Sequence, residues 1–452
     1  MFSRVLVANR GEIAVRVIRA LHELGIEAVA VYSTADEESL HVRLADRAVR
    51  IGPPPAAESY LRIPAIIAAA ETTGCEAVHP GYGFLSENGE FVRACAENDL
   101  VFIGPSAEVM ERMGDKAQAK AEMRAAGVPL VPGTERTASA DAARAAADEL
   151  GYPVLLKAAA GGGGKGMRTV RDGAELATLY DRASSEAQAA FGDGTLYVEK
   201  VIMPARHVEI QVLCDDHGNV LTCGERECSI QRRHQKLIEE SPSPALDAEL
   251  RDEMEASAER ACRHIDYRNA GTIEFLVGPD GAFSFIEMNT RLQVEHPVTE
   301  LVTSLDLVRE QVRIAAGEPL AHGGRTMREG HAIELRINAE DPARDFAPAP
   351  GKITRFRPPL GPGVRVDTFV EDGTTISPYY DSLIAKVIVH DASRMLAIER
   401  AQRVLGEFEI EGVATTRAVL ADILASDEFR SGEYSTSFLE EAGSRLPALA
   451  GS

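Results

Sequence analysis

The chain has 452 residues, of which 45% are hydrophobic and 26% charged. That length predicts two or three domains, and that composition excludes extensive disorder. Seventy acidic and 48 basic residues give a formal net charge of −22, which disfavours nucleic acid and anionic membranes as partners. A cytoplasmic location is expected, because the sequence has no apolar run of about 18 residues and no signal or transit pattern at its start.

Apolar runs alternate with helical patterns through the first hundred residues. Strands are predicted at 5–8, 28–32, 48–51, 77–79 and 101–103. A helix is predicted from Glu12 to Leu24, and Gly25 ends it, because glycine commonly follows the last helical turn. Strands separated by helices predict a doubly wound parallel sheet, which binds ligands beyond the carboxyl ends of its strands. Segments 9–12 and 79–84 lie at that edge.

A small inserted unit is predicted after two alanine-rich helices. The helices are expected at 116–126 and 139–150, and the unit contains strands and a helix at 154–158, 167–170, 173–190 and 196–200. Its short length is typical of a lid. From residue 204 onward alternating strands and a helix at 247–264 predict a mixed domain. The tail after Ser437 is weakly patterned and is expected to fray.

A glycine loop, Gly161-Gly162-Gly163-Gly164-Lys165-Gly166, joins two strands of this lid. A dinucleotide-binding loop must open a helix, whereas a strand is predicted here, and glycine after Lys165 excludes a P-loop. The remaining interpretation is a mobile flap that covers nucleotide phosphates with backbone amides, beside Lys157 on the incoming strand. A flexible surface turn is the alternative.

Two further segments carry polar side chains in patterns that suit a site. His207, Glu209 and Gln211 alternate with apolar residues and so share one face of a strand. That face is either a polar cleft or the outer side of a half-exposed strand. The run Gln231-Arg232-Arg233-His234-Gln235-Lys236 is a local cationic cluster suited to phosphate or bicarbonate. Its alternative is a solvated basic loop.

The strongest pattern is a hairpin from Thr272 to Met288. Pairing through its turn places Glu274 and Glu287 opposite or diagonal to each other, beside apolar residues. Two partly buried like charges are costly unless a cation lies between them. Oxygen ligands on rigid strands, with Asn289 close by, predict Mg²⁺ that bridges nucleotide phosphates. One protonated or arginine-paired glutamate is the alternative.

Polar residues continue at every second position beyond the hairpin. Asn289, Arg291, Gln293 and Glu295 share one face if this segment is extended. A guanidinium beside a carboxylate can orient a small anion and keep a general base ionised, and Arg336 could add a second positive group. These residue types predict an ATP- and magnesium-dependent enzyme with an anion site.

Six motifs together resemble biotin carboxylase, the ATP-grasp component of biotin-dependent carboxylases such as acetyl-CoA carboxylase. They are segments 8–14, 79–88, 113–116, 161–166, 231–236 and 287–296, in the family's order. The similarity runs from residue 5 to about residue 425. It implies an ATP-grasp fold of mixed α/β and α+β class. The expected parts are a parallel N-terminal domain at 1–113, linker helices at 114–130, a mobile lid at 131–202 and a mixed C-terminal domain at 203–446.

The resemblance also implies roles for individual residues. ATP would contact Lys116, Lys157, Gly161, Gly162, Gly163, Gly164, Gly166, Glu199, Lys200, Ile202, His207, Gln231, His234 and Leu276, together with Glu274 and Glu287. Magnesium or manganese would bind Glu274, Glu287 and Asn289. Bicarbonate would bind Lys236, Arg291, Gln293 and Val294, with Glu295 as its general base, and Arg336 and Tyr82 would face biotin. Bicarbonate would attack the γ-phosphate of ATP, and the resulting carboxyphosphate would deliver CO₂ to biotin.

Partners follow from the same resemblance. They are a biotin carboxyl carrier protein, carboxyltransferase subunits and a second copy of the chain, because the family often dimerises through its N-terminal domain. Arg16, Arg19 and Glu23 share a helix face that is either such a contact or a solvated charged face. The sequence holds no Ala/Val-Met-Lys-Met biotinylation motif. The chain is therefore expected to be a free-standing subunit or the front of a longer chain, acting as a ligase in the first half-reaction of acyl-CoA carboxylation for fatty acid synthesis.

Two alternatives stay open. One is another ATP-grasp ligase that uses an acyl phosphate, such as a carbamoyl-phosphate or amino-acid ligase; the pair Arg291 and Glu295 argues against it. The other is a catalytically inactive homologue, which predicts the loss of a catalytic group. Lys236, Arg291, Glu295 and Arg336 are all present.

Overall fold

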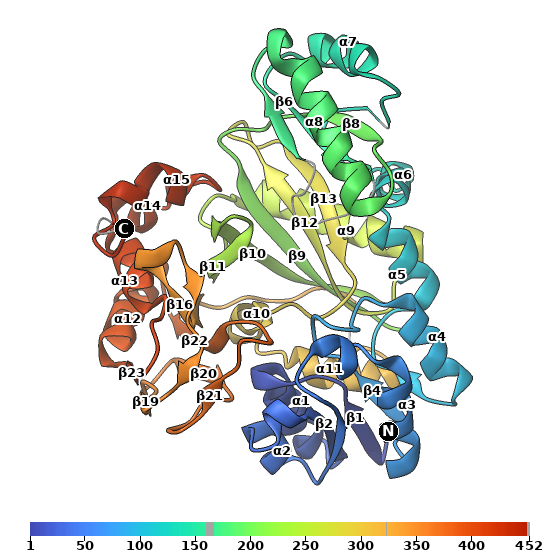
Figure 1. Cartoon of the computed structure of the whole chain (residues 1–452), viewed down its shortest axis with the longest axis vertical. Coiled ribbons are helices and arrows are strands. Elements are labelled where there is room, and N and C mark those ends of the chain that lie inside the picture. The colour runs from blue at the N-terminus through green and yellow to red at the C-terminus, as the bar shows by residue number, and fades with distance from the viewer. Residues whose placement is uncertain (135, 160–166, 322, 450–452) are drawn as a thin grey trace.

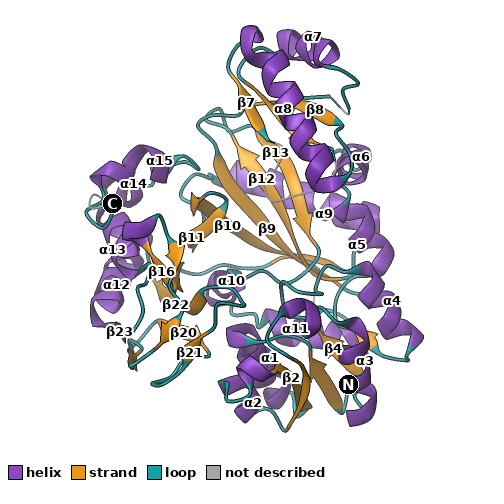
Figure 2. Ribbon diagram, viewed as in Figure 1, coloured by secondary structure: helices purple, strands orange, loops and turns teal. Residues whose placement is uncertain are grey.

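The computed structural model describes residues 1–134, 136–159, 167–321 and 323–449. Figure 1 shows a blue N-terminal domain and a green lid at opposite ends of the molecule, with an orange-to-red C-terminal portion to one side. The strands of a large central sheet run through the middle, and most helices lie around it (Figure 2). Within the described ranges, no helix is long and apolar enough to cross a lipid bilayer.

The N-terminal domain is a parallel sheet with helices on both faces. Its strands are β1 (Arg4–Val7), β2 (Glu27–Ser33), β3 (Arg47–Gly52), β4 (Ala77–His79) and β5 (Val101–Phe102), in the order β3-β2-β1-β4-β5. Its helices are α1 (Gly11–Glu23), α2 (Leu40–Leu44), α3 (Ile63–Thr73) and α4 (Gly89–Glu97). Val5 and Val7 of β1 pack with α1, whereas Leu6 between them packs with α3 and α4 on the opposite face. The predicted doubly wound sheet is confirmed.

The lid is a small antiparallel sheet covered by two helices. Helices α5 (Ala107–Gly114) and α6 (Lys116–Ala125) lead into it, and it contains α7 (Ala140–Leu150), β6 (Val154–Ala158), β7 (Arg168–Val170), α8 (Gly173–Phe191) and β8 (Leu196–Lys200), with strand order β7-β6-β8. Ala147 of α7 and Ala183 of α8 are fully buried against these strands. The predicted elements are confirmed, with ends shifted by at most one residue.

The central sheet continues without a break into the C-terminal half. Its strands are β9 (Arg206–Cys214), β10 (Val220–Arg232), β11 (Gln235–Ser241), β12 (Asn269–Val277), β13 (Phe283–Asn289), β14 (Gly324–Arg325), β15 (His331–Asn338), β20 (Val364–Thr368) and β22 (Leu383–Asp391). They run in the order β13-β12-β9-β10-β11-β15-β22-β20, and β14 pairs with β10. The helices α9 (Ala248–Ile265), α10 (His296–Thr303) and α11 (Leu307–Ala315) connect and cover them. These strands, which lie between residues 206 and 391, thus belong to one continuous sheet.

Short strand pairs and four helices complete the C-terminal portion. The pairs are β16 (Glu340–Asp341) with β17 (Ala347–Pro348), β18 (Gly351–Lys352) with β21 (Thr375–Ile376), and β19 (Arg355–Arg357) with β23 (Glu409–Glu411). The helices are α12 (Arg394–Glu407), α13 (Arg417–Ala425), α14 (Asp427–Ser431) and α15 (Phe438–Ala442). The expectation that the chain frays after Ser437 is wrong as far as Leu446, because Phe438 and Leu446 are only 4% exposed in the core that these helices share.

Glu240 joins the central sheet to this helical layer. Its buried carboxylate on β11 accepts a hydrogen bond from Arg394 Nε of α12 at 2.7 Å and lies 2.6 Å from His331 Nε2 of β15. The Tyr434 hydroxyl donates to its other oxygen. Burial alone would raise the pKa of Glu240, but the hydrogen bonds from His331 and Arg394 lower it to about 2.

Glu240→Gln is expected to lower the free energy of unfolding by about 3 kcal/mol at neutral pH, because it leaves the charge of Arg394 without its buried partner. Because the folded-state pKa of Glu240 is depressed, this stability is present above the ordinary pKa of 4.5 and is lost as the pH falls towards about 2. Denaturant titrations of both proteins at several pH values measure the difference.

Glu407→Gln is the matched control, because Glu407 pairs with Arg403 on an exposed helix surface. That change should cost less than about 0.5 kcal/mol. Equal losses from the two variants at neutral pH would contradict the role given to Glu240.

Candidate active site

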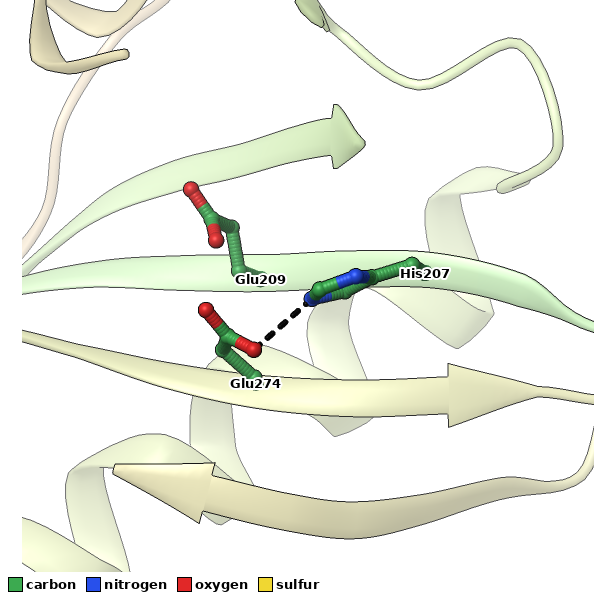
Figure 3. A group of neighbouring side chains, drawn as sticks. All are labelled: His207, Glu209 and Glu274. Carbon is green, nitrogen blue, oxygen red and sulfur yellow. Dashed lines mark ion pairs between the residues drawn. The ribbon is translucent and has the colours of Figure 1, made fainter. Parts of the chain in front are cut away.

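Three glutamates lie side by side on neighbouring strands of the central sheet. Glu274 of β12 is opposite Glu209 of β9 on one side and opposite Glu287 of β13 on the other. The predicted pairing of Glu274 with Glu287 is therefore confirmed. Glu209 and Glu274 are buried, whereas Glu287 is exposed. In Figure 3, Glu274 of β12 points towards His207 of β9, while the carboxylate of Glu209, also on β9, is directed towards the strand on its other side.

Glu274 is held ionised by its neighbours. Its oxygens lie 2.9 Å from His207 Nε2 and accept hydrogen bonds from Asn289 Nδ2 at 2.8 Å and Gln293 Nε2 at 2.9 Å. Burial opposes the charge, but Lys236 and His207 hold the pKa of Glu274 well below its usual range. The face that carries His207 and Glu209 is thus a closed polar interior, and the half-exposed strand considered for it is wrong.

The ammonium of Lys236 lies among three buried carboxylates. Its Nζ is 2.7 Å from Glu209 Oε2, 3.2 Å from Glu274 Oε1 and 2.5 Å from Glu295 Oε1. Burial would lower the pKa of Lys236, but the surrounding negative charge raises it well above its usual value. Without this cation the three carboxylates would repel one another strongly in a low-dielectric interior.

Glu295 is held between two cations. One oxygen faces Lys236, and the other accepts a hydrogen bond from Arg336 at 2.8 Å. Burial opposes ionisation, yet Lys236 and Arg336 hold the pKa of Glu295 well below its usual range. The same guanidinium of Arg336 also pairs with Glu239 of β11. Glu295 therefore carries its charge throughout the neutral pH range.

The segment beyond β13 is not a strand, so the condition under which its alternate residues would share one face is not met. Strand β13 ends at Asn289, a turn forms at 294–295, and α10 begins at His296. Gln293 still reaches Glu274, and Glu295 still reaches Lys236. The loop brings these side chains together because partners on β11 and β12 bind them, and strand geometry plays no part.

The cationic run 231–236 divides into two parts with different surroundings. The turn between β10 and β11 places Arg233 and His234 in the left-handed region, at φ 48° and 67°, and both are exposed. Arg232 and Arg233 pair with Asp345. Only Lys236 reaches the buried carboxylates. The solvated loop is confirmed for Arg233 and His234, and the binding of phosphate or bicarbonate by this run stays a prediction.

Two predicted residues receive their partners from the N-terminal domain. Arg291 donates from Nε to Glu87 at 2.8 Å and from NH2 to Asn289 Oδ1 at 3.1 Å. Tyr82 donates its hydroxyl to Glu12 of α1. Sequence reasoning gave Glu87 and Glu12 no role, although both lie in motifs that carry the resemblance.

Arg226 of β10 is a buried arginine that the sequence did not single out. Its fully buried guanidinium donates to Glu209 at 2.5 Å, Gln211 at 2.7 Å, and Thr272 and Thr299 at 3.0 Å. It binds Glu209 Oε1, whereas Lys236 binds Glu209 Oε2. Arg226 stands between Glu225 and Glu227, and a run of charged residues is typical of an exposed segment, so no signal in the sequence marked it as buried.

The residues predicted for the nucleotide lie mainly on the lid and on β12. Lys157 Nζ of β6 is 2.6 Å from Glu199 Oε2 of β8, and Lys120 of α6 pairs with the same carboxylate. Lys120 was not predicted. Burial lowers the pKa of Lys116, while the charge of Glu287 opposes that shift. Gly161 to Gly166 lie outside the described residues. Among the described residues, no side-chain hydrogen bond or ion pair joins the remaining predicted contacts to one another; these are Lys200, Ile202, Gln231, His234 and Leu276.

Glu274, Glu287 and Asn289 suit a hard divalent cation. The first two present carboxylate oxygens from paired strands, and the amide of Asn289 is bonded to Glu274. Oxygen donors of this kind are what Mg²⁺ prefers. The ligand atoms of His207, Glu209 and Glu274 also lie within 4.8 Å of one another. That second group suits a cation less, because the ammonium of Lys236 already lies against two of its members.

Comparison with known proteins identifies the family. Residues 1–110 match the biotin carboxylase N-terminal domain, 115–323 the carbamoyl-phosphate synthase L chain ATP-binding domain, and 334–441 the biotin carboxylase C-terminal domain. A biotin carboxylase of Nostoc is 53% identical over 97% of this chain and 99% of its own length. The chain belongs to the biotin carboxylase family. A second relative, biotin carboxylase 1 of Bacillus subtilis, is 51% identical over 97% of this chain and 98% of its own length.

A solved structure agrees in fold and length. The biotin carboxylase domain dimer of the Hydrogenobacter thermophilus 2-oxoglutarate carboxylase, in complex with MgADP, ADP and bicarbonate, superposes with a TM-score of 0.93. It is 48% identical and covers 99% of both chains. The ATP-grasp fold is thereby confirmed, and as a biotin carboxylase homologue the chain is a ligase that uses ATP, magnesium and biotin.

Glu287→Gln is expected to weaken the binding of a divalent cation to the complex with ADP by at least about ten-fold, because it removes one charged oxygen ligand. Electron paramagnetic resonance of Mn²⁺ measures the affinity. Glu253→Gln, an exposed change on α9, is the control and should leave the affinity as it is. Equal Mn²⁺ affinities for the Glu287 variant and the parent protein would contradict the assignment of this ligand.

Proposed function

We propose that the buried group around Lys236 binds bicarbonate and activates it for the carboxylation of biotin on a carrier protein. The observation that supports this most is the carboxylate of Glu295, held ionised between Lys236 and Arg336. An ionised base beside two cations can receive a proton from bicarbonate while the cations hold the anion. Arg291, Gln293 and the amide of Val294 complete the proposed anion site.

ATP is proposed to lie between the lid and β12. Lys116 and Lys157 would hold its phosphates, and Glu199 would meet the adenine together with the backbone of Lys200 and Ile202. The pairing of Lys157 with Glu199 keeps the lysine charge at the lid strand that faces this space. Bound at Glu274, Glu287 and Asn289, magnesium would neutralise charge on the phosphates during transfer. The glycine loop would close over them and keep water from the carboxyphosphate.

Biotin is proposed to lie beside Arg336 and Tyr82. The guanidinium would stabilise the negative charge that develops on the ureido oxygen when N1′ loses its proton. Arg336 is a residue of β15 in the central sheet, and its guanidinium is held in place by Glu295 at 2.8 Å. It is therefore positioned to meet a negative charge next to Glu295. The phosphate released from carboxyphosphate would take the ureido proton, and CO₂ would join N1′.

Partners and location are proposed with this activity. A biotinylated carrier and a carboxyltransferase would complete the pathway, and the acyl group that is finally carboxylated would depend on the latter. Two copies would associate, as the Hydrogenobacter domain does. On the helix face considered for this contact, Arg16 is largely buried against Glu300 and Asp306, whereas Arg19 and Glu23 are exposed. All six cysteines are free and buried, which suits the reducing cytoplasm. Pull-down of a biotinylated protein and sedimentation at twice the chain's mass check these partners.

Glu295→Gln is expected to lower biotin-dependent, bicarbonate-stimulated release of ADP by about 100-fold or more, because a general base contributes about that much. The amide keeps the shape of the site, so circular dichroism and ADP affinity should stay close to those of the parent protein. Glu253→Gln is again the control. Turnover within a few-fold of the parent would remove Glu295 as the base.

The same assay separates the alternative activities. ADP release that is indifferent to biotin would point to another ATP-grasp ligase, and absence of any turnover in the parent protein would point to an inactive homologue. The intact set of Lys236, Arg291, Glu295 and Arg336 favours neither.

A further inference from the structure

Lys386 of β22 is a fully buried lysine close to the proposed bicarbonate site. Its Nζ donates a hydrogen bond to the carbonyl of Val294 at 2.8 Å and lies 3.2 Å from Glu12 Oε1. Its exposed fraction is 0%. Because no part of its side chain reaches the surface of the site, Lys386 acts on the site only through the residues it binds.

The hydrogen bond from Lys386 reaches the loop at the turn that carries the proposed bicarbonate contacts. Val294 is the residue between Gln293 and Glu295, and its amide is one of the proposed contacts to bicarbonate. The carbonyl of Gln293, on the other side of that amide, accepts a hydrogen bond from the fully buried Nδ1 of His296 at 2.8 Å. Both peptide planes around Val294 are therefore held by buried side chains, and this fixes the direction of its amide.

The same ammonium also connects to the proposed biotin side. Glu12, on α1 of the N-terminal domain, accepts the hydroxyl of Tyr82 with the oxygen that faces Lys386. On the adjacent strand, Arg336 is the direct cross-strand neighbour of Lys386. One cation thus contacts the loop before α10 and the N-terminal domain, from a strand next to the one that carries Arg336.

A counter-ion role alone does not explain these contacts. Asp367, 4.0 Å from Lys386, is already bound by Arg365 through two hydrogen bonds of 2.9 and 2.7 Å. Among the described residues, Glu12 Oε2 and both oxygens of the buried Glu334 have no hydrogen-bond partner. The ammonium of Lys386 instead donates one of its hydrogen bonds to the neutral carbonyl of Val294. A lysine present only to balance charge would direct its donors to the carboxylates, which form stronger bonds.

We propose that Lys386 is a positioning residue for bicarbonate, which orients the Val294 amide and the Glu295 carboxylate by fixing the turn between them. This inference rests on the proposed function of that turn. The substrate expected to depend on Lys386 is bicarbonate. Nucleotide affinity should not depend on it, because Val294 and Glu12, which Lys386 contacts, are not among the proposed ATP contacts.

Lys386→Met tests the proposal, since it keeps the length of the side chain and removes the donor. The bicarbonate KM is expected to rise at least ten-fold, while the KM for ATP changes less than two-fold. A general loss of structure would raise both constants together. Lys352→Met, at an exposed lysine of β18, is the matched control and should change neither.

Removal of a buried charge can prevent folding, so a charge-balanced variant accompanies the first. Lys386→Met combined with Glu12→Gln leaves neither charge of the pair and should show the same selective rise in bicarbonate KM. A folded variant of either kind with a bicarbonate KM within two-fold of the parent would overturn the proposal, as would equal rises for bicarbonate and ATP.

Glu295→Gln, assayed in parallel, separates this inference from the proposed function. If that variant is inactive while the Lys386 variants bind bicarbonate normally, only the role of Lys386 fails. If Glu295→Gln turns over normally, the assignment of the turn to bicarbonate fails, and with it the basis for Lys386.

Discussion

The buried ammonium of Lys236 is the interaction on which the proposed site depends. Three carboxylates from β9, β12 and the loop before α10 lie within 3.2 Å of it. Ions out of water are stable only when opposite charges and hydrogen bonds replace the lost hydration. Lys236 supplies that charge at the centre, and Arg226 and Arg336 supply it at the two ends. In the proposed function, bicarbonate would take the place of one of these negative partners beside the cations.

The continuous central sheet explains why these charges can be placed so closely. Strands β9, β12 and β13 carry Glu209, Glu274 and Glu287. The same sheet continues from β9 through β10 and β11 to β15, which carries Arg336. Residues distant in sequence thus share one rigid frame, which is the condition for precise placement of reacting groups. The proposed phosphate end and biotin end lie on different strands of that frame, with bicarbonate between them.

Contacts between domains complete the site. Glu87 of the N-terminal domain accepts a hydrogen bond from Arg291, and Glu12 of the same domain lies 3.2 Å from Lys386 of β22. A substitution at the junction of two domains should therefore affect substrate binding even where it touches no substrate. The pair of Lys157 and Glu199, by contrast, lies within the lid.

Much of the fold was predictable from sequence, because its signals are local. The strands of the parallel domain, the lid elements and the hairpin of Glu274 and Glu287 each follow from periodicity or from a turn. The path of residues 290–295 was not predictable, because it depends on partners from β11 and β12 that are far away in sequence. Arg226 was missed for a related reason, because a run of charged residues is typical of an exposed segment and its partners Glu209, Thr272 and Thr299 are distant in sequence. The tail was underestimated because Phe438 and Leu446 are spaced without period, although they fill one core.

The most direct measurement of this account is the rate of biotin-dependent, bicarbonate-stimulated ADP release by Lys236→Gln, in protein that still unfolds cooperatively and binds ADP. The amide removes the central positive charge and keeps a hydrogen-bond donor. If the ammonium both holds Glu295 ionised and attracts bicarbonate, the rate should fall by about 100-fold or more. A rate within a few-fold of the parent protein would contradict the account, because the three carboxylates would then function without the cation between them.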